Sequence, residues 1–112
     1  CMYCVMSHGA ALRIATGNPY ISDQITVNYH EADLTPREKA IIDFAMKVTI
    51  ESHKINETDF ESLKSHGLTD EDIWDIAGIT AFFNMSNRLM NFAAVHADEE
   101  FYMKGRNPAQ NQ

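Results

Sequence analysis

The segment from Ile73 to about Ala94 constrains the fold most, because apolar residues occupy most of its helical circumference. Its large apolar residues are Ile73, Trp74, Ile76, Ile79, Phe82, Phe83, Met85, Leu89, Met90 and Phe92. A helix that is apolar on nearly every side has to be covered by other helices or by another subunit. We therefore expect the longest helix here, either central or at a subunit interface, in a protein that forms homo-oligomers.

Shorter helices are predicted before this segment. Helix formers run from Met2 to about Thr16, and Gly17-Asn18-Pro19 is a usual helix stop. Ile21 and Ile25 lie four residues apart and favour a short helix within residues 20–28.

Thr35-Pro36-Arg37-Glu38 predicts another helix start, since Thr35 can cap the helix and Pro36 suits its first position. That helix should end near Ser52. Its expected buried face contains Ile41, Phe44, Ala45, Val48 and Thr49.

A further helix, capped by Asn56 or Thr58, should run through His66 and end at Gly67. The acidic run at residues 69–72 suits the start of the longest helix, and that at residues 98–100 is interpreted as a solvated end. No segment shows convincing strand alternation. The predicted fold class is all-α, a bundle of about five helices in one domain over residues 1–104, followed by a polar tail at 105–112.

The charge pattern excludes several classes of partner. The formal net charge is −7, and the nine Lys and Arg residues are scattered rather than clustered, so nucleic acid is excluded as a partner. No apolar run approaches the roughly 18 residues that a membrane span needs, and no signal peptide pattern occurs. We expect a soluble, cytoplasmic protein. Because the sequence opens on Cys1 rather than Met, we also expect a fragment that lacks an upstream segment.

The chemistry of the chain is predicted to lie in its first turns. Cys1, Cys4 and His8 follow one another at spacings of three and four, which places them on one helical face. The same face continues through Ala11, Leu12 and Ala15, so we expect it to point toward the core.

A helix start lowers the pKa of a nearby thiol, and cysteines one turn apart lie within disulfide range. Cys1 and Cys4 can therefore cycle between dithiol and disulfide. Cys4, which is nearer His8, is predicted to attack a substrate and become a sulfenic acid, which Cys1 then resolves. His8 is predicted to act as the general acid and base.

Two other interpretations remain open. Cys1, Cys4 and His8 can serve as metal ligands, but a closed zinc site needs four. The fourth would have to come from elsewhere in the chain, and the candidates are His30, His53, His66 and His96. The chain can also be a non-catalytic subunit of a helical oligomer, with ordinary thiols.

Asn84, Asn87 and Arg88 are polar residues within the apolar longest helix. We expect them to be buried and to hydrogen-bond to loop carbonyls or across a subunit interface. A peroxide-binding role for Arg88 is the weaker alternative.

The run Cys1-Met2-Tyr3-Cys4 through His8, followed by Leu12-Arg13, resembles the signature of the alkyl hydroperoxidase D-like (AhpD-like) proteins of the carboxymuconolactone decarboxylase superfamily. Nearly the whole chain is similar to their peroxidase-related enzyme subgroup. The further matching runs are Thr16-Gly17-Asn18-Pro19, Leu34-Thr35-Pro36-Arg37-Glu38, Gly67-Leu68-Thr69-Asp70 and Phe82-Phe83-Asn84-Met85-Ser86-Asn87-Arg88-Leu89.

The resemblance implies an oligomeric, all-helical peroxidase with antioxidant, peroxiredoxin-type activity and no metal or organic cofactor. Cys4 matches the cysteine that becomes a sulfenic acid, Cys1 matches its disulfide partner, and His8 matches the proton-relay histidine. The implied substrate is a hydroperoxide, and the electrons come from a thiol or protein reductant that the sequence does not identify. A decarboxylase activity is suggested by the superfamily's name alone.

This chain departs from the best-studied members at two points. Those members have a second histidine between the cysteines, where this chain has Tyr3. They also carry a catalytic glutamate upstream of the first cysteine, a position that lies outside this sequence. We expect turnover to depend on whether that glutamate is supplied.

Overall fold

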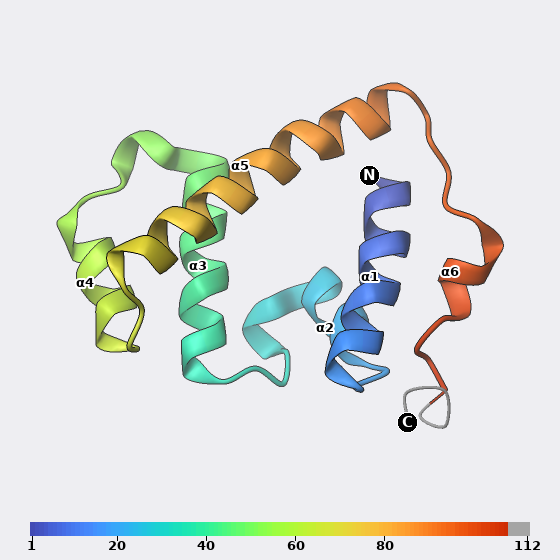
Figure 1. Cartoon of the computed structure of the whole chain (residues 1–112), viewed down its shortest axis with the longest axis horizontal. Coiled ribbons are helices and arrows are strands. Elements are labelled where there is room, and N and C mark those ends of the chain that lie inside the picture. Colours follow the sequence, from blue (N-terminus) through green and yellow to red (C-terminus); the bar gives the residue numbers. More distant parts are fainter. Residues whose placement is uncertain (108–112) are drawn as a thin grey trace. The chain divides into compact units, whose positions relative to one another are not determined.

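The computed structural model describes residues 1–107, and all of its regular elements are helical over that range (Figure 1). The elements in chain order are α1 (Met2–Thr16), α2 (Ile21–Asn28), the 3-10 turn η1 (Tyr29–Glu31), α3 (Pro36–Glu51), the 3-10 turn η2 (Ser52–Lys54), α4 (Glu57–Ser65), α5 (Asp70–Phe92) and α6 (Glu99–Met103). The predicted all-α class is confirmed.

The described residues form two compact units. The first unit contains residues 1–33 and the described residues from 87 onward, and the second contains residues 34–86. The predicted boundary between a domain at 1–104 and a polar tail stays a prediction. The tail's residues 108–112 lie outside the described part of the chain.

The local signals in the sequence place most helix ends correctly. Gly17 ends α1 in the left-handed conformation, with φ of 68°, which glycine adopts without steric penalty. Thr35 Oγ1 accepts the Glu38 N–H at the start of α3. Of the two candidate caps for α4, Asn56 is the one used, and its side chain accepts the Thr58 N–H.

The start of α5 contains a reciprocal cap as well as the predicted acidic first turn. The Thr69 N–H donates to Asp72 Oδ2 at 2.8 Å, and the Asp72 N–H donates to Thr69 Oγ1 at 3.1 Å. These hydrogen bonds with Thr69 hold the pKa of Asp72 below its ordinary value. The start of the longest helix is therefore fixed by hydrogen bonds in addition to its dipole.

The second unit has an apolar core shared by α3, α4 and the first part of α5. Its buried residues are Phe44, Leu63, Leu68 and Ile73. The Phe44 and Phe60 rings meet edge-on, with centroids 6.3 Å apart. Lys47 Nζ also binds both carboxylate oxygens of Asp59, which joins α3 to α4.

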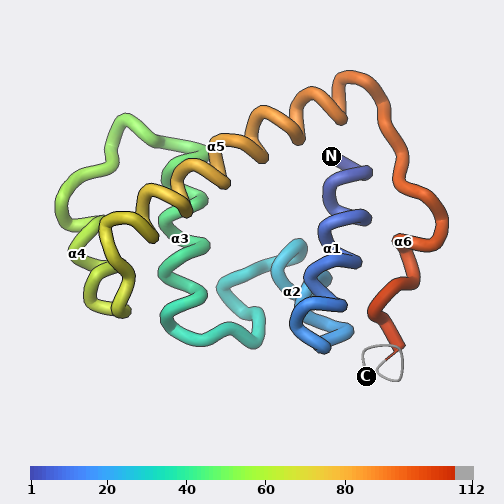
Figure 2. Tube along the Cα trace, in the orientation of Figure 1, coloured from blue at the N-terminus to red at the C-terminus, as the bar shows by residue number. Residues whose placement is uncertain are grey.

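The first unit packs α1 against α2 and α6. The chain reverses direction between α1 and α2 over residues 17–20 (Figure 2). Its buried residues include a charged side chain, Arg13, which is only 2% exposed. This unit therefore has a buried charged residue at its centre, and the second unit has none.

Two features differ from the sequence predictions. The structure has six α-helices over residues 1–107 rather than about five, because the acidic run predicted to be a solvated end forms the start of α6. Asn84 and Asn87 are only half-buried and Arg88 is exposed, whereas all three were expected to be buried. Asn84 Nδ2 donates to Thr49 Oγ1 at 3.2 Å, so this amide joins α5 to α3.

The longest helix buries less of its surface than its composition suggests. Ile73 is buried, but Trp74 is 78% exposed and Phe92 is 89% exposed. Over the described residues, no helix is both long enough and apolar enough to cross a membrane.

Candidate functional site

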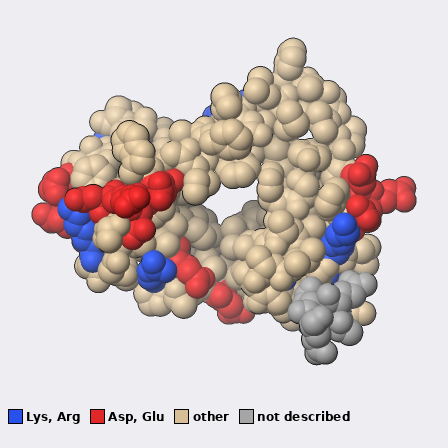
Figure 3. Space-filling model, in the orientation of Figure 1, with Lys and Arg blue, Asp and Glu red and all other residues tan. Residues whose placement is uncertain are grey.

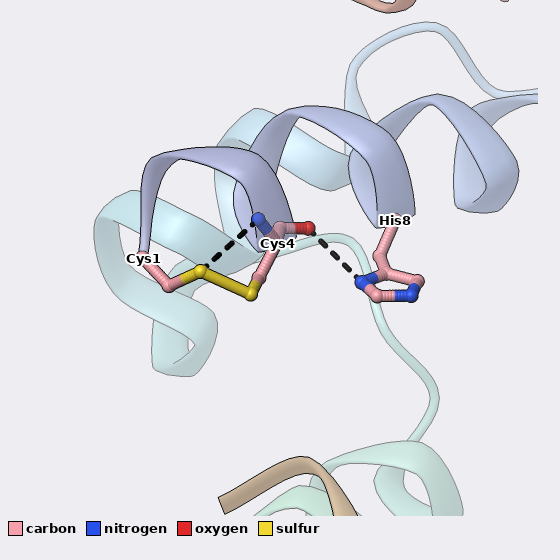
Figure 4. The surroundings of a disulfide bond; sticks show 3 residues. All are labelled: Cys1, Cys4 and His8. Carbon is pink, nitrogen blue, oxygen red and sulfur yellow. Dashed lines mark hydrogen bonds between the residues drawn. A yellow bond between two sulfur atoms is a disulfide. The ribbon is translucent and has the colours of Figure 1, made fainter. Parts of the chain in front are cut away.

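The two cysteines lie at the first turn of α1, as the spacing predicts. Cys1 is the N-cap of the helix, and its Sγ accepts the Cys4 N–H at 3.3 Å. The Cα atoms of Cys1 and Cys4 are 5.3 Å apart, and their sulfur atoms are joined in a disulfide bond (Figure 4). One helical turn therefore holds the pair at bonding distance without any other segment.

The helix start favours negative charge on these sulfurs. The first turn of α1 contains no acidic residue to offset the positive end of the helix dipole. The N–H that points at Cys1 Sγ is also a donor that a thiolate at this position would accept.

The burial of this face differs from the prediction. Cys4 is buried at 7% exposure, but Ala11 and Ala15 on the predicted core-facing stripe are exposed. The buried residues of α1 are instead Cys4, Ala10 and Arg13, and Arg13, nine positions after Cys4, lies on the opposite side of the helix. Arg13 is held by α2 and the end of α6, whereas His8, next to Cys4 on the other side of α1, is exposed.

His8 lies next to Cys4 but contacts its backbone rather than its sulfur. His8 Nδ1 is 3.1 Å from the Cys4 carbonyl oxygen (Figure 4). A carbonyl oxygen only accepts hydrogen bonds, so Nδ1 must carry the hydrogen. The neutral ring then has its basic nitrogen at Nε2, the atom that would take up or release a proton. The side chain is exposed.

Arg13 holds the C-terminal half of α1 by hydrogen bonds. Our sequence reasoning assigned no role to this residue. Its Nε donates to the Lys104 carbonyl at 2.8 Å and its Nη2 to the Phe101 carbonyl at 3.0 Å. Its Nη1 donates to Ser22 Oγ at 2.9 Å. One guanidinium thereby joins α1 to α2 and to the end of α6.

The charge of Arg13 is affected by burial and by two neighbours. Burial lowers its pKa below the ordinary value, the Arg106 charge lowers it further, and Asp23 opposes the change. Arg106 in turn binds Asp23 through Nη1 at 2.6 Å, which lowers the pKa of that carboxyl. The sequence offers one clue to Arg13, its place in the Leu12-Arg13 pair that follows the cysteine motif.

The remaining histidines lie on other segments of the chain than the cysteine turn. His53 lies in η2, His66 caps the end of α4, and His30 stacks on Tyr29 with ring centroids 4.0 Å apart. His96 is exposed after the end of α5. Within residues 1–107, no three His, Cys, Asp or Glu side chains gather closely enough to hold a metal ion.

Two solved structures are similar to nearly the whole chain. One is described as the alkylhydroperoxidase AhpD core, an uncharacterized peroxidase-related protein from Ralstonia eutropha JMP134. It is 54% identical over 96% of this chain, with a TM-score of 0.95. The other is an uncharacterized peroxidase-related protein from Silicibacter sp. TM1040, 43% identical over 95% of this chain, with a TM-score of 0.91.

This chain spans only 57% and 56% of the lengths of those two solved chains, respectively. No protein-family model and no curated protein matches the sequence.

Proposed function

Since this chain belongs with the AhpD-like, peroxidase-related proteins, we propose that it is a thiol-dependent oxidoreductase that reduces hydroperoxides through Cys1 and Cys4. The observation that carries the proposal is the cysteine pair at the start of α1, one turn apart and joined as a disulfide. His8 beside Cys4 supplies a ring nitrogen that can accept and donate a proton.

The cycle starts from the dithiol. The Cys4 thiolate attacks the terminal oxygen of the hydroperoxide, so that an S–O bond forms and the O–O bond breaks. The leaving alkoxide takes a proton and departs as an alcohol, or as water when the substrate is hydrogen peroxide. Cys4 is then a sulfenic acid.

Cys1 completes the oxidation. Its thiolate attacks the Cys4 sulfur, the S–S bond forms, and the sulfenic oxygen leaves as water. An outside thiol or a protein dithiol then reduces the disulfide by thiol–disulfide exchange and is itself oxidised. The proposal needs no metal or organic cofactor.

His8 has the role of proton carrier in this cycle. With Nδ1 donating to the Cys4 carbonyl, Nε2 is the nitrogen that accepts a proton from a thiol and returns it to the leaving oxygen. The exposure of the side chain allows that nitrogen to exchange protons with solvent.

Steady-state reduction of cumene hydroperoxide and hydrogen peroxide, with dithiothreitol as reductant, tests this function. We expect Cys4→Ser to abolish turnover and His8→Ala to lower it about 100-fold. His96→Ala is the matched control, because His96 is also exposed and lies outside the cysteine turn. A Cys4→Ser variant that turns over as fast as the parent contradicts the proposal.

We also propose that copies of this chain associate through the outer face of α5. Five large apolar side chains lie on one face of this helix and are each more than half exposed: Trp74, Phe82, Met85, Leu89 and Phe92. Figure 3 shows mostly uncharged atoms along the later turns of α5 in this view. Such a patch on a soluble chain is typical of an interaction surface.

Light scattering at micromolar concentration tests the association. We expect an oligomer for the parent chain and a smaller species for Phe82→Glu, which places a charge in the middle of the apolar face. A folded monomer for the parent chain contradicts the proposal.

A further inference from the structure

Ser7 lies one turn after Cys4 on α1, and its hydroxyl has no structural partner. Ser7 Oγ is buried, yet it has no hydrogen-bond partner within the described residues. Buried polar atoms in folded proteins nearly always have a partner, so an exception of this kind calls for an explanation.

The hydroxyl does not make the bond that is usual for its position. Helical serines and threonines commonly donate to the carbonyl four residues earlier. Thr16, Thr26, Thr49 and Thr80 all do so, at 2.7 or 2.8 Å. For Ser7 the corresponding acceptor is the Tyr3 carbonyl, one turn back on the same helix, and the bond is not made.

The position of Ser7 directs its hydroxyl toward Cys4. Helical side chains point back toward the N-terminus, and residues three apart are neighbours on the helix surface. Cys4 is three residues before Ser7, and it is buried at 7% exposure.

The acceptor strength of Cys4 depends on its redox state. In the disulfide, its sulfur is bonded to Cys1 and is a weak acceptor. A thiolate or a sulfenate at the same position carries a negative charge and accepts a hydrogen bond strongly. The Ser7 hydroxyl is therefore seen unpaired in a state in which the Cys4 sulfur is a weak acceptor.

We propose that Ser7 is a positioning residue whose hydroxyl donates a hydrogen bond to the Cys4 sulfur whenever the Cys1–Cys4 disulfide is open. It rests on the proposed function only in taking Cys4 as the sulfur that reacts with peroxide. The bond stabilises the thiolate and leaves the disulfide with an unpaired hydroxyl. Ser7 thus shifts the pair toward its reduced, reactive form.

Apart from Cys1, which the Cys1→Ser background removes throughout, the other groups that affect Cys4 are the same in every variant to be compared. Cys1, Tyr3 and His8 are the titratable groups on the same two turns of α1. On the elements packed against α1, the carboxylate of Asp23 and the guanidinium of Arg106 pair with each other near Arg13. Arg13 lies about 13 Å further along the helix axis than Cys4.

The test is the thiolate pKa of Cys4, measured from ultraviolet absorbance against pH in a Cys1→Ser background that leaves a single thiol. We expect Ser7→Ala to raise this pKa by about one unit, the effect of one hydrogen bond to a charged group. Ser7→Thr keeps the hydroxyl and should stay near the parent value. Thr16→Val is the matched control on α1, because its hydroxyl already bonds to Leu12, and it should change nothing.

A second readout is the equilibrium of the intact cysteine pair with glutathione. Ser7→Ala should make the disulfide harder to reduce, by about 10-fold in the equilibrium constant, which corresponds to one pKa unit. If the Cys1→Ser background does not fold, the pH dependence of Cys4 alkylation in the reduced parent and in Ser7→Ala gives the same pKa difference.

An unchanged pKa and an unchanged equilibrium in Ser7→Ala would overturn the proposal. So would equal destabilisation of the reduced and oxidised forms, because that result marks a merely structural hydroxyl. Neither readout needs peroxide turnover. A chain that fails to reduce hydroperoxides but shows the pKa shift would sink the proposed function and leave the role of Ser7 intact.

Discussion

Each of the two units of this chain is stabilised internally by a different kind of interaction. The second unit has a conventional apolar core of Phe44, Leu63, Leu68 and Ile73. The first unit has a buried arginine, whose three hydrogen bonds reach Ser22 and the carbonyls of Phe101 and Lys104. The cysteine pair lies in the first unit, on the same helix as that arginine.

The two kinds of interaction differ in how much change in geometry they tolerate. Apolar cores accept moderate repacking, because dispersion and burial have little directional preference. A guanidinium that donates to three fixed acceptors accepts only one arrangement, since each misplaced bond leaves a buried polar group unpaired. We infer that the helix that carries the cysteine pair is held by directional bonds, whereas the second unit is held by packing.

Removal of the arginine should have the largest effect. Arg13→Met leaves two carbonyls and a hydroxyl without their donor, and we expect a loss of about 3 to 5 kcal/mol in unfolding free energy. Urea denaturation measures the loss, and limited proteolysis should show earlier cleavage around α6. Arg37→Met, at an exposed position on α3, is the control. A loss below about 1 kcal/mol would remove the distinction between the units.

Truncation of the apolar core should rank second. Leu63 is 1% exposed, and Leu63→Ala should lower the unfolding free energy by about 3 kcal/mol through lost burial and a residual cavity. The alkylation rate of the reduced cysteines in native buffer should stay the same, because the core contacts of Leu63 lie within the second unit. A marked change in that rate would show that the two regions are not separable.

A glycine in each unit gives a matched pair. A Cβ on Gly105 would lie 2.7 Å from Arg13 Cβ, and φ there is 76°. Gly67 has a similar φ of 84°, with nothing within 4 Å of the added atom. Thermal denaturation should show a loss of about 1 kcal/mol for Gly67→Ala, from backbone strain alone, and at least about twice that for Gly105→Ala. Equal losses would mean that the surroundings of Arg13 yield easily.

Acid should weaken one ion pair in each unit, with the smallest effect. Hydrogen bonds lower the pKa of Asp23 through Arg106 and that of Asp59 through Lys47, both from an ordinary value of 3.8. The pKa of each carboxyl is lower in the folded state than in the unfolded state. Each ionised carboxylate therefore stabilises the fold at pH values above its unfolded pKa, and this stabilisation is lost as the pH falls through its folded pKa.

Each pair is partly exposed and solvent-screened, so its contribution should be below about 1 kcal/mol. Asp23→Asn and Asp59→Asn should each reduce the loss of stability between neutral and acidic pH, as followed by urea denaturation. A steeper acid loss in either variant would contradict the direction of the pKa shift.

Sequence reasoning located the helices of the second unit well because their signals are local. The caps at Thr35 and Asn56 and the left-handed Gly67 each act within a few residues. The apolar spacing also identified Phe44 as a core residue. Patterns of this kind are determined by neighbours along the chain and can be read without a structure.

The first unit was less predictable because its contacts are distant in sequence and polar. Arg13 bonds to carbonyls 88 and 91 residues away, and arginine is ordinarily an exposed residue. Sequence reasoning does not detect these Arg13 hydrogen bonds. It therefore placed the buried face of α1 on the side of His8 and did not predict α6. The Cys1–Cys4 pairing was within reach because it needs only one helical turn.

We propose that α1, the helix that Arg13 holds by hydrogen bonds, carries a peroxidase site. A single-turnover experiment tests this proposal most directly. The fully reduced chain is mixed with an equimolar amount of cumene hydroperoxide, and the thiols, the alcohol product and the disulfide are followed together. We predict that both thiols are lost for each hydroperoxide reduced, with Cys1–Cys4 as the product and no reaction in Cys4→Ser. Thiols that persist while peroxide remains, or an equal rate in Cys4→Ser, would contradict the account.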